Sequence, residues 1–191
     1  KKLYSMMNNP LIAEFIGTAI LLLLGCGIVA NVNLKKTKAE GQSPWVLITS
    51  AWGFSVFVGA YVAGKYSGAH LNPAVTIGLA TAGKFTWKMV LPYMISQLAG
   101  AMFGSWIVYL VYIDHYRQTE DEKIVLSTFA TGPAIRNFKN NFFSEFVGTF
   151  ILVFCIFFIA SPNITFENIE IINFGIGSLE SLPVGILVWV I

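Results

Sequence analysis

One stretch, residues 67–75, places hydrogen-bonding groups and small residues between two long apolar runs; it reads Ser-Gly-Ala-His-Leu-Asn-Pro-Ala-Val. Non-helical backbone is tolerated at membrane depth only where it is buried in protein or lines a water-filled cavity. We therefore expect the carbonyl groups of Gly68, Ala69 and His70 to face a solute as hydrogen-bond acceptors. The side-chain amide of Asn72 would add a donor. The chemistry predicted for this stretch is the exchange of hydrogen bonds with a passing molecule.

Helices must hold this stretch in place. Asn72 is a favourable N-cap and Pro73 suits the first helical position, so a short helix is expected from about Ala74 to Gly83. Long apolar runs on either side are predicted to cross a bilayer, which takes roughly 20 residues per helix. The expected spans are about Pro10–Val32, Trp45–Gly64, Met89–Tyr112 and Phe142–Ala160, with a further apolar run from Pro183 to Ile191.

The composition excludes several classes of function. Of 191 residues, 55% are hydrophobic and only 12% are charged, and the mean hydropathy is +0.69, which is typical of an integral membrane protein. A net charge of +2 gives no reason to expect a nucleic-acid partner. Cys26 and Cys155 both lie in apolar runs and suggest neither a disulfide nor a metal site. With no phosphate loop or nucleophile–base pair in the sequence, we expect no cofactor and no enzymatic activity.

Two carboxylates fall inside apolar spans, Glu14 and Glu145. They begin the related segments Glu-Phe-Ile-Gly-Thr and Glu-Phe-Val-Gly-Thr, which are 145 − 14 = 131 residues apart. Carboxylates inside a membrane are costly and need partners, so their equivalent placement predicts an internal duplication. Chemically, such a pair also fits the proton-relay or cation site of a secondary transporter.

The 67–75 motif resembles the first of two Asn-Pro-Ala loops in the major intrinsic protein (aquaporin) superfamily, and most closely the glycerol uptake facilitator (aquaglyceroporin) branch. Four further segments match in the expected order: Ala13-Glu14-Phe15-Ile16-Gly17-Thr18, Trp52-Gly53, Ser96-Gln97-Leu98-Ala99-Gly100-Ala101 and Glu145-Phe146-Val147-Gly148-Thr149. The resemblance implies an all-α transmembrane fold, an inverted-repeat helical bundle with a re-entrant half-helix.

The same resemblance implies how the chain is divided. The first repeat would occupy residues 1–112, a loop between the repeats 113–141, and an incomplete second repeat 142–191. Because the sequence starts at Lys1 and stops inside an apolar run, we expect both ends to be trimmed. A second Asn-Pro-Ala loop, followed by Arg and Asp, is expected beyond Ile191. A non-conducting chain is a third possibility beside a channel and a transporter, since a chain with only one such loop would form no complete pore.

Roles for individual residues also follow from the resemblance. The pore-lining residues would be Trp52, Val56, Gly68, Ala69, His70, Leu71 and Asn72. The residues supporting the loops would be Glu14, Gln97, Pro73, Ala74 and Glu145. The implied function is passive passage of glycerol, other small uncharged solutes and water through a homotetramer in the cell membrane. A dedicated water channel and a secondary transporter using the two glutamates stay open as alternatives.

Overall fold

The computed structural model describes residues 6–41, 45–159 and 177–191, which contain helices and no β-strand. The helices are α2 (Pro10–Asn33), α3 (Trp45–Ser67), α4 (Pro73–Thr81), α5 (Trp87–Val111), α6 (Ile113–Gln118), α7 (Glu122–Ser127), α8 (Phe138–Phe158) and α9 (Leu182–Val190), with a 3₁₀ turn at Gly177–Ser181. Among the described residues, 4 helices are long and apolar enough to cross a membrane: α2, α3, α5 and α8.

The expected spans agree with these helices to within a few residues, and local capping explains where the helices begin. Asn9 caps α2, because its Oδ1 accepts a hydrogen bond from Leu11 N at 3.0 Å, and Pro10 occupies the first turn. Helix α8 begins at Phe138 rather than about Phe142. The side chain of Asn137 accepts from Asn140 N at 3.3 Å and so starts the helix earlier.

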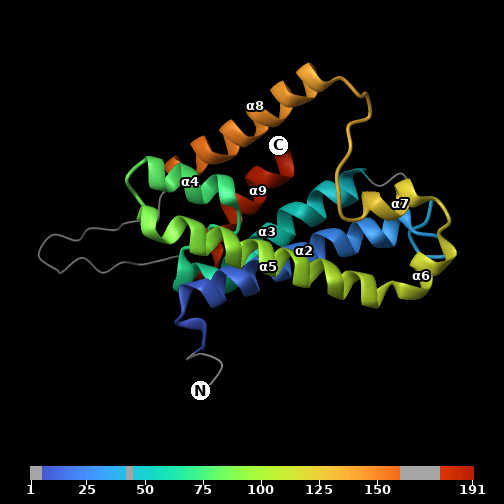
Figure 1. The fold of residues 1–191 in the computed structure, drawn as a ribbon, viewed down its shortest axis with the longest axis horizontal. Helices are drawn as coiled ribbons and strands as arrows, with labels where there is room; N and C mark the ends of the chain where they lie inside the picture. Colours follow the sequence, from blue (N-terminus) through green and yellow to red (C-terminus); the bar gives the residue numbers. More distant parts are fainter. Residues whose placement is uncertain (1–5, 42–44, 160–176) are drawn as a thin grey trace, which may run out of the picture.

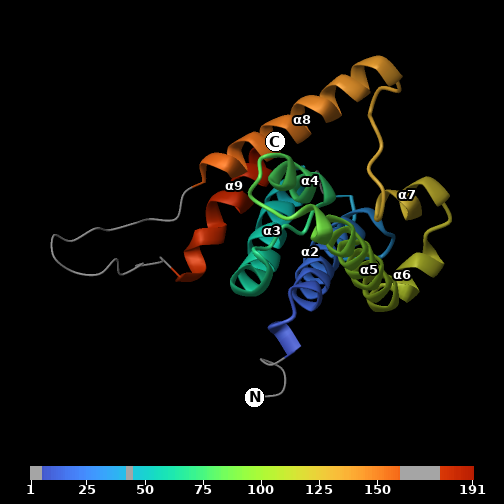
Figure 2. The same ribbon diagram turned by 60° about the vertical axis from the view of Figure 1, so that its left-hand side comes forward.

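Helix α2 lies between α3 and α5, and the three run side by side (Figures 1 and 2). Glycines allow close contact between α2 and α3. A methyl group in place of the Gly59 α-hydrogen would lie 2.7 Å from the Gly17 carbonyl oxygen. On the other side of α2, methyl groups at Gly100 and Gly104 of α5 would overlap the backbone of Phe15 and Ala19. Small residues at such positions let membrane helices approach each other closely.

Helix α9 packs against α3 through a second pair of glycines. A methyl group on Gly53 would lie 2.7 Å from the carbonyl oxygen of Gly185, and the reverse distance is also 2.7 Å. Helix α8 lies across the top of the molecule in Figure 1 and contacts α4 and α9. Val153 of α8 fills the space beside Gly78 of α4.

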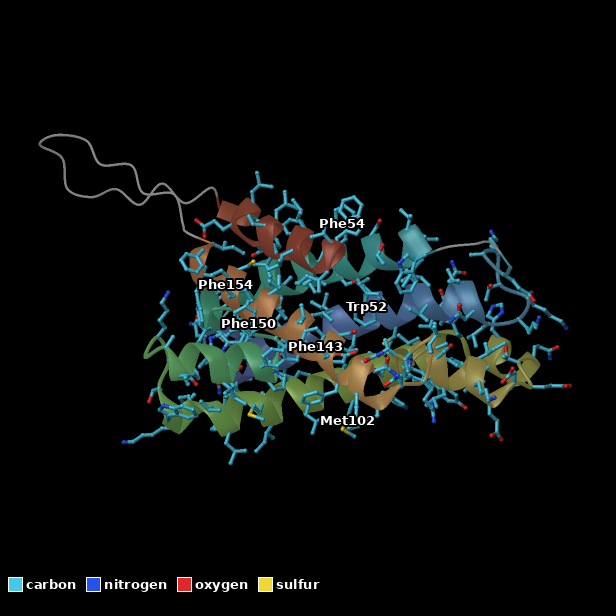
Figure 3. All side chains as sticks on the ribbon, turned by 90° about the horizontal axis from the view of Figure 1, so that it is seen from above. Trp52, Phe54, Met102, Phe143, Phe150 and Phe154 are labelled. Atoms are coloured by element: carbon cyan, nitrogen blue, oxygen red, sulfur yellow. The ribbon has the colours of Figure 1, made fainter. Side chains whose placement is uncertain are left out.

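The outer surface of α8 is a row of phenylalanines spaced four residues apart, and none of the described residues of α8 is buried. Figure 3 shows two of them, Phe150 and Phe154, spread along the helix with Phe143. Neighbouring ring centroids in the row are 4.9–6.4 Å apart wherever a contact is formed. Such an apolar outward face is typical of a helix whose surroundings are not water. The row consists of Phe138, Phe142, Phe146, Phe150, Phe154 and Phe158.

The segment expected as a polar loop at residues 113–141 instead contains the two short helices α6 and α7. They form because the segment carries apolar side chains with a surface to pack on. Tyr116 is buried against Cys26 and Leu34, and its hydroxyl is 2.8 Å from Thr128 Oγ1. Hydrogen bonds also join α6 to the turn after α2, such as the one between His115 Nδ1 and the Lys35 carbonyl at 3.0 Å.

Candidate functional site

The candidate site is the break between α3 and α4, residues 68–72, where the backbone is neither helical nor extended throughout. Gly68 has φ of 82°, and Ala69 and Leu71 have φ of 48° and 50°. A residue with a side chain in this left-handed region costs on the order of 1–3 kcal/mol, so the surrounding structure must hold the break in place. The strained backbone therefore points to a specific set of supporting contacts.

Glu14, in the second turn of α2 and facing the break, supplies most of that support. Its side chain is completely buried. Its Oε1 accepts hydrogen bonds from His70 N at 2.9 Å and Ser67 Oγ at 2.6 Å. Its Oε2 accepts from Leu71 N at 2.8 Å and Gln97 Nε2 at 2.7 Å. Four donors on two oxygens match the accepting capacity of an ionised carboxylate, so the buried group is satisfied by dipoles without a basic partner.

The backbone groups of the break are used asymmetrically. The N–H groups of His70 and Leu71 are held by Glu14, and that of Ala69 donates to Ser67 Oγ at 3.0 Å. The carbonyl groups of residues 68–71 accept no hydrogen bond from the described part of the chain. Because buried backbone carbonyls are nearly always paired, a run of unpaired ones indicates that they face water or a solute.

Asn72 ends the break and begins α4. Its Oδ1 accepts from Ala74 N at 2.8 Å, and Pro73 fills the first helical position. The amide group of Asn72 has no partner among the described residues and stays free to donate. Because the N-terminus of a helix carries partial positive charge, the start of α4 adds a positive potential to this end of the break.

The ring of His70 is held by groups from α4, α5 and the turn between them. Its Nδ1 is 3.1 Å from Thr76 Oγ1, and its ring centroid is 4.6 Å from that of Phe85 and 4.9 Å from that of Tyr93. Tyr93 also donates its hydroxyl to the Ser67 carbonyl at 3.0 Å.

Sequence reasoning missed the roles of Thr76, Phe85 and Tyr93. Two of them carry a signal that could have been used. Thr76 follows Asn72 by one helical turn, and Tyr93 precedes Gln97 by one turn, so each shares a helix face with a residue already singled out. Phe85 lies in a turn, and its local sequence gives no comparable indication.

The side chain of Leu71 departs from the expected pore-lining position. It is buried between α2 and α3, where its methyl groups fill the space beside Gly17 and Gly59. An apolar side chain with φ of 50° is accommodated here because the two glycines leave room for it. Of the polar groups of Leu71, only the carbonyl is left without a partner among the described residues.

Trp52 lies in the half of α3 that is remote from the break, 15 residues before Ser67, or about 22 Å along the helix. Its half-buried ring packs on α2, where a methyl group at Gly25 would lie 2.5 Å from a ring carbon. Trp52 therefore faces the neighbouring helix rather than pointing away from the bundle, as Figure 3 shows by contrast for Met102 on the outer side of α5. Val56 lies one turn further along α3 and is also half-buried.

Glu145 differs from Glu14 in its surroundings. It is exposed on α8, and it makes no hydrogen bond with the described residues. With Ser144, Gly148 and Thr149 it lines an open pocket of about 420 Å³ between α8 and α9. The described residues contain no second break that could donate to it, so its loop-supporting role stays a prediction. They also contain no group of three or more His, Cys, Asp or Glu side chains placed to hold a metal ion.

Three comparisons agree on the kind of protein this is. Glycerol uptake facilitator protein 3 of Lactiplantibacillus plantarum is 50% identical over 153 residues, which cover 78% of this chain and 63% of that protein. A probable glycerol uptake facilitator protein of Thermotoga maritima is 43% identical over 178 residues, which cover 93% of this chain and 71% of that protein. The X-ray structure of the aquaglyceroporin from Plasmodium falciparum superposes with a TM-score of 0.75 at 34% identity, covering 94% of this chain and 69% of that one.

The family model described as major intrinsic protein matches residues 4–190, nearly the whole chain. The chain spans less than two thirds of the length of the Lactiplantibacillus relative. The all-helical fold, the half-helix that follows a backbone break and the apolar spans fit the same assignment. The protein is a multi-pass membrane protein and belongs to the major intrinsic protein family.

Proposed function

We propose that the protein is a passive transmembrane channel for glycerol and other small uncharged solutes, with water. The observation that carries the proposal is the run of unpaired carbonyl groups at residues 68–71. A hydroxyl group that leaves bulk water loses hydrogen bonds, and a series of acceptors at short intervals replaces them. The names of the relatives, two of them glycerol uptake facilitators, support the same substrate class.

In the proposal, the solute path has Trp52 at one end and runs along α3 to the break at residues 68–72. The indole of Trp52 offers a flat apolar surface to the carbon backbone of a solute and an N–H donor to its oxygen. Val56 continues the apolar side. Further along, hydroxyls donate to the carbonyls of Gly68, Ala69 and His70, and the Asn72 amide donates to an oxygen. Ions are refused because too few ligands replace their hydration shell.

The surroundings of Glu14 favour a channel over a proton-coupled transporter. Both of its oxygens already accept two short hydrogen bonds, from groups that hold the break in shape. Binding a proton would convert an acceptor into a donor and displace one of these groups. Glu14 is therefore a scaffolding residue in the proposal.

Further parts of the proposal follow from family membership. The protein is a channel and not an enzyme, it needs no cofactor, and it lies in the plasma membrane as a homotetramer. A first repeat, residues 1–112, and an incomplete second repeat, residues 142–191, are joined by residues 113–141. Glu145 supports the second repeat as Glu14 supports the first.

Flux measurements on purified protein in lipid vesicles test the proposal. Stopped-flow light scattering should show glycerol entry faster than in empty vesicles, linear in the gradient and independent of pH or sodium gradients. Trp52→Ala should let larger polyols enter, whereas Trp87→Ala, at an exposed position of α5, should change nothing. Water flux without glycerol flux would identify a dedicated water channel. Saturable uptake that is coupled to an ion gradient, and is abolished by Glu14→Gln in protein whose break between α3 and α4 stays intact, would identify a transporter.

A further inference from the structure

The hydroxyl group of Thr76 contacts three partners, and together they determine which nitrogen of His70 carries a proton. Thr76 Oγ1 is 3.0 Å from the Asn72 carbonyl oxygen, 2.9 Å from Gln97 Nε2 and 3.1 Å from His70 Nδ1. A threonine hydroxyl has one proton to donate and two lone pairs to accept with. All three positions are therefore used.

The roles of two partners are fixed by their chemistry. A carbonyl oxygen only accepts, so the hydroxyl proton goes to Asn72. The amide of Gln97 is oriented by Glu14, because a carboxylate accepts and the amide nitrogen must face it at 2.7 Å. The same nitrogen then donates to Thr76. The remaining lone pair of the hydroxyl can only accept, so His70 Nδ1 must be the donor and carries the proton.

A neutral imidazole protonated at Nδ1 has a free lone pair at Nε2. Two aromatic rings, those of Phe85 and Tyr93, pack on the imidazole and hold it in place. The edge with Cδ2 and Nε2 lies beside Gly68, where a methyl group would be 3.8 Å from both atoms. Nε2 accepts no hydrogen bond from the described residues and is not among their buried unpaired atoms.

We propose that His70 presents Nε2 to the solute path as an acceptor beside the carbonyl of Gly68, and that Thr76 is the positioning residue that imposes this state. The claim that Nε2 faces a solute rests on the proposed function, whereas the protonation state of His70 does not. It adds a side-chain acceptor to the backbone row. A ring with its proton on Nε2 would interrupt that row with a donor.

Nitrogen-15 NMR of histidine-labelled protein in lipid bilayers, at slightly alkaline pH, measures the protonation state without any flux assay. The protein contains two histidines, and the His115→Gln variant removes the signal of the second one. The expected spectrum of His70 has a protonated Nδ1 and an unprotonated Nε2. A protonated Nε2 in the unmodified protein would overturn the proposal.

Two variants test the positioning role. Thr76→Val keeps the shape and removes the hydroxyl, so it should populate the state with the proton on Nε2 and lower glycerol flux by about two- to tenfold, the size of one hydrogen bond. Thr76→Ser keeps the hydroxyl and should retain both the spectrum and the flux. An unchanged His70 spectrum in folded Thr76→Val would refute the role of Thr76. Absence of glycerol flux in the unmodified protein would refute the proposed function instead, and the NMR spectrum would still decide the protonation state.

Discussion

Replacing Glu14 by glutamine should open the break between α3 and α4. The amide that replaces one carboxylate oxygen cannot accept, so two of the four buried donors lose their acceptor. Because Oε1 accepts from His70 N and Oε2 accepts from Leu71 N, one N–H of the break loses its acceptor whichever oxygen is replaced. A buried donor without a partner costs about 1–3 kcal/mol, so the two together cost about 2–6 kcal/mol.

Hydrogen exchange of the amides in residues 68–72, followed by mass spectrometry on protein in lipid nanodiscs, measures this opening. At 1.4 kcal/mol per factor of ten, exchange should accelerate by about 30-fold to about 10⁴-fold. The strained φ angles of Ala69 and Leu71 act in the same direction, because opening relieves them. Exchange in α2 and α5 should change far less.

Glu40→Gln is the matched control. Glu40 also accepts from a backbone N–H, that of Lys36 at 2.7 Å, and from a side chain, Lys35 Nζ at 2.9 Å, but it is exposed to solvent. The exchange of residues 68–72 should be unaffected by this change. If Glu14→Gln left a folded protein with normal protection at His70 and Leu71, the break would be held by packing, and the reasoning given for the carboxylate would be wrong.

Three further predictions use other contacts. Gly100→Ala should lower the thermal stability of the protein in detergent, because the new methyl group overlaps the α2 backbone, whereas Gly64→Ala, with open space around it, should be neutral or stabilising. Asn72→Ala and Asn9→Ala each remove a helix cap and should each cost about 1 kcal/mol of stability, but only Asn72→Ala should reduce glycerol flux. The pKa of Glu40 is lowered, first by the hydrogen bond from the Lys35 side chain and then by the one from the Lys36 backbone N–H. A lowered pKa means that the stabilisation is present at neutral pH and lost on acidification through the folded-state value. The protection of the amides in residues 35–40, measured relative to the intrinsic exchange rate at each pH, should therefore fall in acid, and Glu40→Gln should remove that dependence.

The fold and the position of the site were largely accessible from the sequence, because both rest on local signals. The apolar runs that form α2, α3 and α5 are long enough to be assigned as membrane spans without further information, and Asn72-Pro73 marks the start of α4 directly. Glu14 and Gln97 stand out as polar residues in apolar spans. Each such group needs a partner at membrane depth, and the break supplies it.

Other features depend on contacts between segments far apart in the chain. The sequence of residues 113–141 is polar on average, and the apolar cluster around Cys26 and Leu34 makes helices α6 and α7 favourable there. Leu71 belongs to the motif that we propose faces the solute, yet its side chain turns the other way because Gly17 and Gly59 leave space between α2 and α3. Phe85 reaches His70 only because the turn after α4 returns the chain. None of these can be read from spacing alone.

The one-sided use of backbone groups at residues 68–71 has a consequence for chemical selectivity. Each backbone N–H there donates to an acceptor within the protein, so this stretch offers a solute carbonyl lone pairs and no hydrogen-bond donor. In the proposed channel, a polyol or urea would bring its own hydrogens and exchange water for carbonyl oxygen at little cost. An aprotic molecule of similar size, such as dimethyl sulfoxide, has nothing to donate and must give up its hydration without replacement, so it should be held back even though it is narrow enough to fit.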